Sequence, residues 1–149
     1  MATTPCSAAL KVVLGNTFTM YFKAHSYHWN VEGKNFNDYH AFFATIYNDL
    51  WLAVDLIAEK IRIVDDYAPV SIEELYTYKT VSEDTGLVVN QQKFANLLAA
   101  NQQVIDSLNT LFKEATAIND QGLADFAAGR LDVHAKHAWM IRSLMKSGE

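Results

Sequence analysis

The sequence has few residues that interrupt helices and almost no cysteine. Its 149 residues include six glycines, two prolines and one cysteine, whereas half of them are apolar. So few glycines and prolines permit long, uninterrupted helices. The single Cys6 excludes an internal disulfide and indicates a reducing compartment. A chain of this length is expected to form one domain, residues 1–149, that buries about two-thirds of its unfolded surface.

Positive charge is also scarce. The net charge is −5, and no lysine or arginine precedes Lys11. Affinity for phosphate depends on clustered cations, so this distribution argues against DNA binding, whereas an acidic balance can concentrate metal cations. The N-terminus lacks a basic start followed by an apolar core, and no run of about eighteen apolar residues occurs. We therefore expect a cytoplasmic protein without a membrane segment.

Apolar residues recur with a helical period along four long segments, which predicts four long helices. We expect them at residues 8–31, from 35–38 to 64, at 90–117, and from a cap at Asn119 to about 145. Ser71 and Glu74 form a capping-box pattern that predicts a short helix over residues 71–78. The expected fold is all-α, a four-helix bundle with a short extra helix in the connection between the second and third long helices. A connection of this length fits the ferritin-like arrangement.

Each long helix has an apolar stripe that is expected to face the core, and some stripes include histidine. The stripe of the first helix contains Leu10, Leu14, Thr17, Tyr21 and His28, with His25 beside it. The stripe of the second helix contains His40, Ala44, Tyr47, Trp51, Val54, Ala58 and Ile61. The stripe of the last helix includes His134 and His137.

Three of the five histidines lie within HSYHWNVEGKNFNDYH, on both sides of an expected helix–helix turn. In an antiparallel hairpin, His28 and His40 would lie side by side because each is about six residues from the turn. Asp55 and Glu59 are one turn apart and share a face of the second helix. However, Asp55 follows His40 by fifteen residues, roughly 22 Å along a helix axis. Metal–ligand bonds are about 2 Å long, so the two pairs cannot meet in one chain.

The two pairs can meet in a symmetric dimer, where the histidines of one chain face the carboxylates of its partner. Two imidazoles and two carboxylates suit a transition metal such as iron. No glutamate is followed by histidine three residues later, so the usual metal site inside one bundle is absent. The alternative is that the histidines are ordinary core residues. Asp55 and Glu59 are harder to explain in that way, because buried carboxylates are rare unless they are paired or bind metal.

Several segments resemble the Dps-type mini-ferritins (DNA-binding proteins from starved cells), and the resemblance covers nearly the whole chain. They are HSYHWNVEGKNFNDYH, then DLIAEKI, YAPVSIEEL and KHAWMIRSL. The resemblance implies a ferritin-like subunit of a hollow dodecamer that oxidises Fe(II) with hydrogen peroxide or oxygen, stores ferric iron and protects against oxidative damage. It implies His28 and His40 from one subunit and Asp55 and Glu59 from its partner as iron ligands, with zinc as a substitute metal.

The sequence departs from this pattern at one position. Ala44 stands where the family commonly has aspartate, one turn after the second histidine. We therefore expect the second iron position to be weaker or to be completed by water, and His25 is a candidate substitute ligand. His137, beside Trp139, matches a position where the family often has histidine, and we interpret it as structural. His134 lies one turn earlier and is left unassigned.

The family's three-fold pores carry acidic residues near the start of the last helix. Asp125 matches such a position, and Asp120 lies close to it. For Asp120 a position on a solvated helix face is an equally good explanation, and for Asp132 it is the better one.

Two other functions compete with iron oxidation. One is DNA compaction, for which family members generally use Lys- or Arg-rich tails that this sequence lacks. The other is a shell that has lost ferroxidase activity, a possibility raised by Ala44.

Overall fold

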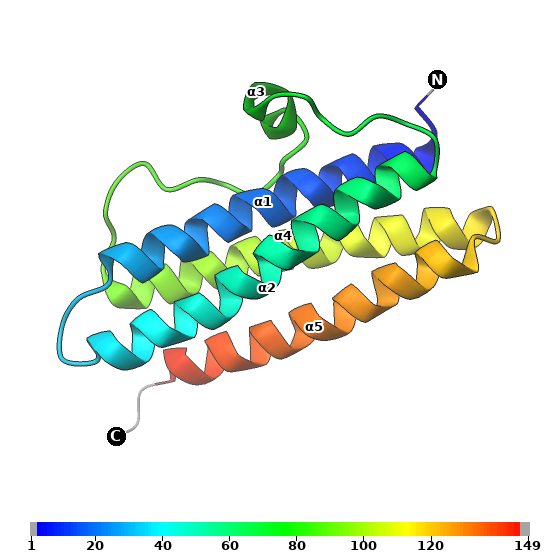
Figure 1. Cartoon of the computed structure of the whole chain (residues 1–149). Coiled ribbons are helices and arrows are strands. Elements are labelled where there is room, and N and C mark those ends of the chain that lie inside the picture. Colours follow the sequence, from blue (N-terminus) through cyan, green and yellow to red (C-terminus); the bar gives the residue numbers. More distant parts are fainter. Residues whose placement is uncertain (1–2, 147–149) are drawn as a thin grey trace.

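The computed structural model describes residues 3–146, which form four long helices and one short helix (Figure 1). The helices are α1 (Pro5–Asn30), α2 (Phe36–Ile63), α3 (Ile72–Tyr76), α4 (Asn90–Ala117) and α5 (Gln121–Met145). The hairpins α1–α2 and α4–α5 pack together mainly through α1 and α4, and the connection that carries α3 runs over α1. No strand occurs among the described residues. The predicted all-α bundle, with its short extra helix, is therefore confirmed.

The helix starts are set by side-chain caps. Thr4 and Ser7 form a capping box, which is why α1 begins at Pro5, earlier than predicted. The predicted cap of the last helix, Asn119, is wrong. Asp120 caps α5 by accepting a hydrogen bond from the Leu123 N–H at 3.0 Å, whereas Asn119 has a φ of 59° and belongs to the preceding turn. Both residue types cap helices well, so composition could not distinguish the two positions.

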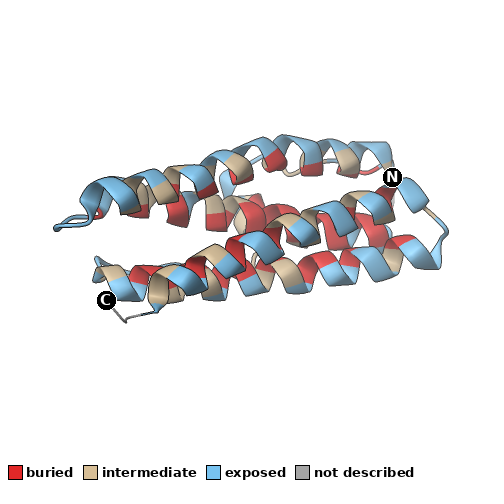
Figure 2. Cartoon of the chain, turned by 90° about the horizontal axis from the view of Figure 1, so that it is seen from below, coloured by how far each residue is buried: buried red, intermediate tan, exposed pale blue. Residues whose placement is uncertain are grey.

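The stripe predicted to face the core from α2 is partly right, but it lies beside the most buried face of the helix. The buried residues of α2 are Phe43, Ile46, Leu50, Ala53, Ile57 and Ile61, and Figure 2 shows the buried residues facing the interior of the bundle. Of the predicted stripe, Ile61 is buried and Trp51 is 55% exposed. Three other members are partly buried against the core: Tyr47, Val54 and Ala58. Helix α2 is apolar on two adjacent faces, and periodicity alone cannot show which face packs in the core.

The second apolar face of α2 is exposed in the single chain. It carries Trp51, Leu52 and Leu56. Helix α2 is long and apolar enough to cross a membrane, judged by length and composition alone. It is the one such helix among residues 3–146. Asp55 and Glu59 interrupt its apolar sequence. Apolar area of this kind on a bundle helix is typical of a surface that another protein covers.

Candidate metal centre

His28 and His40 lie side by side, as the spacing predicts. The turn between α1 and α2 is closed by a hydrogen bond from the Phe36 N–H to the Gly33 carbonyl at 3.1 Å, and Gly33 has a φ of +112°, which glycine adopts readily. The two imidazole rings stack with centroids 3.6 Å apart and an interplanar angle of 15°. Both side chains are half-buried, so the pair remains accessible from outside the bundle.

Each ring of this pair is held by the backbone of the other residue. His28 Nδ1 lies 2.7 Å from the His40 carbonyl oxygen, and His40 Nδ1 lies 2.6 Å from the His28 carbonyl oxygen. A carbonyl oxygen can only accept, so each Nδ1 carries the hydrogen and donates. In neutral imidazoles this leaves both Nε2 lone pairs free. A metal-binding histidine is typically oriented in this way, by a hydrogen bond from its other ring nitrogen.

Asp55 and Glu59 lie on the exposed face of α2, one turn apart. They are not buried, so the premise that burial makes them unusual is wrong for the single chain. Within residues 3–146 neither carboxylate makes a hydrogen bond or an ion pair. Two unpaired carboxylates among the apolar side chains of Trp51, Leu52 and Leu56 would be costly if another subunit covered them without supplying a cation.

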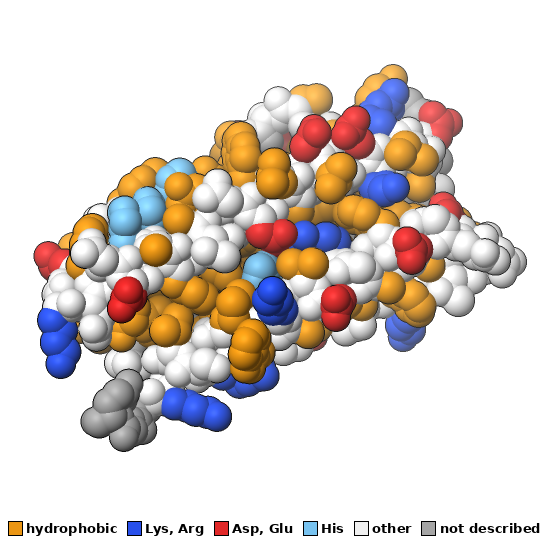
Figure 3. Space-filling model, turned by 60° about the horizontal axis from the view of Figure 1, so that its bottom comes forward, with side chains coloured by type: hydrophobic (Ala, Val, Ile, Leu, Met, Phe, Trp, Pro, Cys, Tyr) orange, Lys and Arg blue, Asp and Glu red, His pale blue; other side chains and the backbone are white. Residues whose placement is uncertain are grey.

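The four predicted ligands do not come together in one chain. No group of three or more His, Cys, Asp or Glu side chains in the described part of the chain could hold a metal ion. Figure 3 shows histidine side chains gathered toward one end of the bundle, among hydrophobic side chains. A site that used all four predicted ligands would therefore need a second subunit.

His25 is bound to neighbours rather than free. Its Nδ1 lies 2.9 Å from the Tyr21 hydroxyl, and its ring stacks on Tyr47 with centroids 3.9 Å apart and lies 4.2 Å from Trp29. Burial, and then the neighbouring His28, lower the pKa of His25. Burial, and then Tyr47, raise the pKa of Tyr21. A neutral His25 that accepts a hydrogen bond from a protonated Tyr21 is consistent with both directions.

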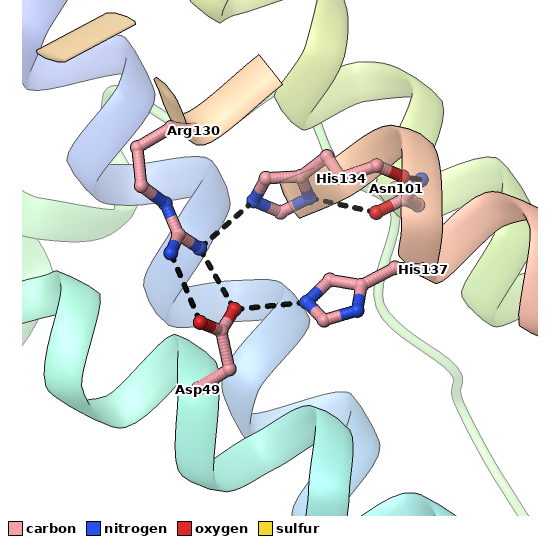
Figure 4. Close-up of polar contacts among 5 residues, drawn as sticks. All are labelled: Asp49, Asn101, Arg130, His134 and His137. Carbon is pink, nitrogen blue, oxygen red and sulfur yellow. Dashed lines mark hydrogen bonds and ion pairs between the residues drawn. The ribbon is translucent and has the colours of Figure 1, made fainter. Parts of the chain in front are cut away.

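The other two histidines belong to a buried network that ties α5 to α2 and α4 (Figure 4). Arg130 donates to both carboxylate oxygens of Asp49, at 3.0 and 2.9 Å. His137 Nε2 lies 2.8 Å from Asp49 Oδ2. His134 is fully buried, with Nε2 3.2 Å from Arg130 and Nδ1 2.7 Å from the Asn101 amide oxygen.

This network fixes the protonation of its members. Arg130 can only donate, so His134 accepts at Nε2 and donates from Nδ1 to Asn101. Burial, and then the charge of Arg130, lower the pKa of His134 to about 3. Although burial raises it, hydrogen bonds from His137 and Arg130 hold the pKa of Asp49 below its usual range. The structural interpretation of His137 therefore agrees with the contacts.

The sequence analysis did not identify Asp49 and Arg130 as members of this network. The one signal in the sequence that could have indicated Arg130 is its spacing of one helical turn from His134.

The acidic residues proposed for a pore have different surroundings. Asp120 is occupied as the cap of α5. Asp125 is exposed and makes no ion pair within the described residues, and Asp132 is exposed beside a groove between α2 and α5 of about 510 Å³. Of the three, only Asp120 has a side-chain hydrogen bond among residues 3–146, whereas the carboxylates of Asp125 and Asp132 are both exposed and without one.

Comparisons with known proteins identify the family and the fold of the chain. Residues 7–149 match the model of the ferritin-like domain family. The chain is 31% identical over 135 residues to a low temperature-induced protein of Nostoc sp., covering 89% of this chain and 75% of that protein. It is 22% identical over 133 residues to the DNA protection during starvation protein of Brevibacillus brevis, covering 89% of each chain. A Dps protein of Vibrio cholerae O1, a ferritin-like diiron-carboxylate protein, superposes with a TM-score of 0.90 at 25% identity, covering 95% of this chain and 89% of that one.

Proposed function

Because the chain belongs to the ferritin-like family and is a mini-ferritin of the Dps type, we propose that it binds Fe(II), oxidises it and stores the ferric product in a hollow homo-oligomer. The oxidant is hydrogen peroxide or oxygen, and the shell is a dodecamer. The observation that carries this proposal is the reciprocal bonding of His28 and His40, which leaves two Nε2 lone pairs side by side at the surface.

The site is shared between two subunits related by a two-fold axis. Asp55 and Glu59 of the partner subunit face His28 and His40, and the symmetry generates a second, identical site. The exposed apolar face of α2 supports this arrangement, because a dimer would bury Trp51. The same contact would give the two carboxylates a metal cation as counter-charge in place of water.

The donor set fits iron. Imidazole nitrogens and carboxylate oxygens are ligands of Fe(II), and zinc binds the same donors. The two carboxylates neutralise the charge of Fe(II), and they bind the Fe(III) product more strongly because its charge is higher. The Nδ1–H bonds of His28 and His40 keep both rings in the ligating tautomer during turnover. Asp125 is proposed to lie on the route by which iron enters the shell, and Asp120 acts mainly as a helix cap.

Replacement of the carboxylates tests the proposal. Asp55→Asn with Glu59→Gln keeps the shape of the side chains but removes the charge, so we expect iron oxidation by hydrogen peroxide to be lost while sedimentation still shows a dodecamer. The matched control is Asp106→Asn with Glu83→Gln, which neutralises two other exposed carboxylates. An unchanged rate in the Asp55/Glu59 variant would refute the site. A wild-type shell that assembles but oxidises no iron would instead indicate that the chain kept the fold and lost the chemistry.

DNA protection is a second candidate function, because it is named for the Brevibacillus brevis relative. The net charge of −5 argues against it, since few counterions could be released from DNA. We expect no retardation of plasmid DNA at physiological salt in a mobility-shift assay. Retardation that persists in the presence of a chelator would support DNA binding, because the chelator removes bridging divalent cations.

A further inference from the structure

The connection from α3 to α4, residues 77–89, covers a polar pocket that contains none of the proposed metal ligands. The connection passes along α1 before it reaches the start of α4 (Figure 1). Together these three segments enclose a pocket of about 350 Å³. Its polar lining includes Ser26 from α1, Asp84 and Thr85 from the connection, and Lys93 from α4. The rim of the pocket is exposed, so a small ligand can enter it from solvent.

Two buried lysines, Lys23 and Lys93, lie in this region beside a single carboxylate, that of Asp84. Lys23 forms an ion pair with Asp84, in which Nζ lies 3.0 Å from Oδ1. Asp84 Oδ1 also accepts a hydrogen bond from the Asn96 amide at 3.0 Å, and Oδ2 accepts one from the Tyr27 hydroxyl. Both oxygens of Asp84 are therefore engaged, and the charge of Lys23 balances its own.

Lys93 has no counter-charge of this kind. The residue is only 4% exposed, and its Nζ donates a hydrogen bond to the Val88 carbonyl at 2.5 Å. No carboxylate oxygen among residues 3–146 lies within 4.0 Å of this nitrogen. The start of α4, one turn before Lys93, has no side-chain cap and no acidic residue, so the helix dipole adds to the positive potential. A buried ammonium is costly unless an anion accompanies it.

We propose that this pocket binds a phosphate group, with the Lys93 ammonium as its counter-charge. The ammonium has three N–H donors, of which the Val88 carbonyl uses one. The hydroxyls of Ser26 and Thr85 line the same pocket, and neither donates a hydrogen bond to another described residue. Free donors favour a ligand whose oxygens only accept. Because they come from three segments, the oxygens of a tetrahedral phosphate suit them better than the single plane of a carboxylate.

A bound phosphate joins the connection to both helices. By mass action, a ligand that binds only the folded chain stabilises this arrangement. The pocket binds its ligand without iron, so the inference goes beyond the proposed function and does not depend on it.

Isothermal titration of the assembled, iron-free protein with inorganic phosphate tests the inference; iron is left out because it binds the anion itself. We expect saturable binding of one phosphate per chain. Lys93→Met keeps an apolar stem but removes the charge, and it should weaken binding about tenfold or more. The matched control is Lys113→Met, which removes one positive charge from an exposed position of the same helix. It should bind phosphate as wild type does.

A second variant leaves Lys93 in place. Ser26→Ala with Thr85→Val removes the two hydroxyl donors and should weaken phosphate binding about fivefold. Sedimentation and circular dichroism establish that each variant is folded and assembled before it is titrated. Loss of affinity in this variant as well as in Lys93→Met would place the anion between α1, the connection and α4.

Titrations with glycerol phosphate and acetate identify the ligand. Tighter binding of glycerol phosphate than of inorganic phosphate would support the phosphate of a small organic molecule, and weaker binding would support the free ion. Acetate binding as tight as that of phosphate would overturn the phosphate assignment. Absence of saturable phosphate binding by wild type, or equal binding by wild type and Lys93→Met, would overturn the site and leave Lys93 as a structural support of Val88.

Discussion

His28 and His40 lie close to the turn of the α1–α2 hairpin, whereas His134 and His137 lie between the helices of the bundle (Figure 4). The first pair uses one nitrogen of each ring for a backbone carbonyl and leaves the other nitrogen at an accessible surface. In the second pair, His134 uses both ring nitrogens within the protein. His137 uses one for Asp49, while its Nδ1 is enclosed without a partner. Free and accessible nitrogen atoms, rather than the presence of histidine, separate a candidate metal site from a structural one.

This comparison predicts that the two pairs can be separated by mutation, and the largest effect is expected at the outer pair. His28→Ala with His40→Ala removes both imidazole ligands. Metal affinity should fall by more than the roughly 10–100-fold that loss of an outer-shell partner causes, and iron oxidation should be lost in stopped-flow absorbance. Stability should fall by only about 1 kcal/mol for each lost hydrogen bond. Wild-type oxidation rates in this variant would contradict the assignment of the outer pair.

The inner network should behave in the opposite way. Asp49→Asn keeps the shape but leaves the Arg130 guanidinium without its counter-charge, so we expect a loss of about 3 kcal/mol in the free energy of unfolding. Iron oxidation by the protein that remains assembled should persist. The control is Asp132→Asn beside the same groove, which should change stability by about 0.5 kcal/mol or less. Equal effects of the two substitutions in urea titrations would show that the network carries no special stability.

Acid should weaken the inner network specifically. His134 has a pKa of about 3 in the folded chain, against about 6.5 when unfolded. The unfolded state therefore binds more protons between these values, and stability falls as pH decreases from about 6.5. Between pH 8 and pH 5 the free energy of unfolding should fall by about 2 kcal/mol more in wild type than in His134→Gln. The glutamine does not titrate but can still hydrogen-bond to Asn101. Identical pH dependence of the two unfolding free energies would refute the neutral, buried state of His134.

The smallest effect is expected from restoring the residue that the family pattern contains. Ala44→Asp places a carboxylate one turn after His40, so the second Fe(II) of each site should bind more tightly. Isothermal titration without oxidant would measure this as a stronger second binding step. Stability should change by only about 0.5 kcal/mol, because Asp is a poorer helix former than Ala. An unchanged second step would show that Ala44 does not limit iron binding.

Much of the fold was predictable because its signals are local. Caps, breakers and a helical period identify the helices from residues close together in the chain, and α4 runs over the predicted residues. The contact between His28 and His40 was predictable for a similar reason. A short turn brings together positions that are equally distant from it, so no knowledge of the rest of the bundle was needed.

The remaining features depend on partners that are distant in the sequence. The bonds from Asp49 to Arg130 and His137 join residues 81 and 88 positions apart, and no local pattern indicates them. The error in the predicted core stripe of α2, which included the exposed Trp51, has a related cause. Phe43 and Trp51 both lie on apolar faces, and only the packing of α2 against the other helices decides that Phe43 is buried and Trp51 exposed.

The central claim, that each iron site combines halves from two subunits, is tested most directly by mixing subunits. One chain carries His28→Ala and His40→Ala, and the other carries Asp55→Asn and Glu59→Gln; each is expected to be inactive alone. The two are unfolded, combined in equal amounts and reassembled. If chains pair at random, about a quarter of the sites join an intact histidine half to an intact carboxylate half, and the iron oxidation rate should recover to about that fraction of wild type. No recovery in shells shown by mass spectrometry to contain both chains would contradict a shared site.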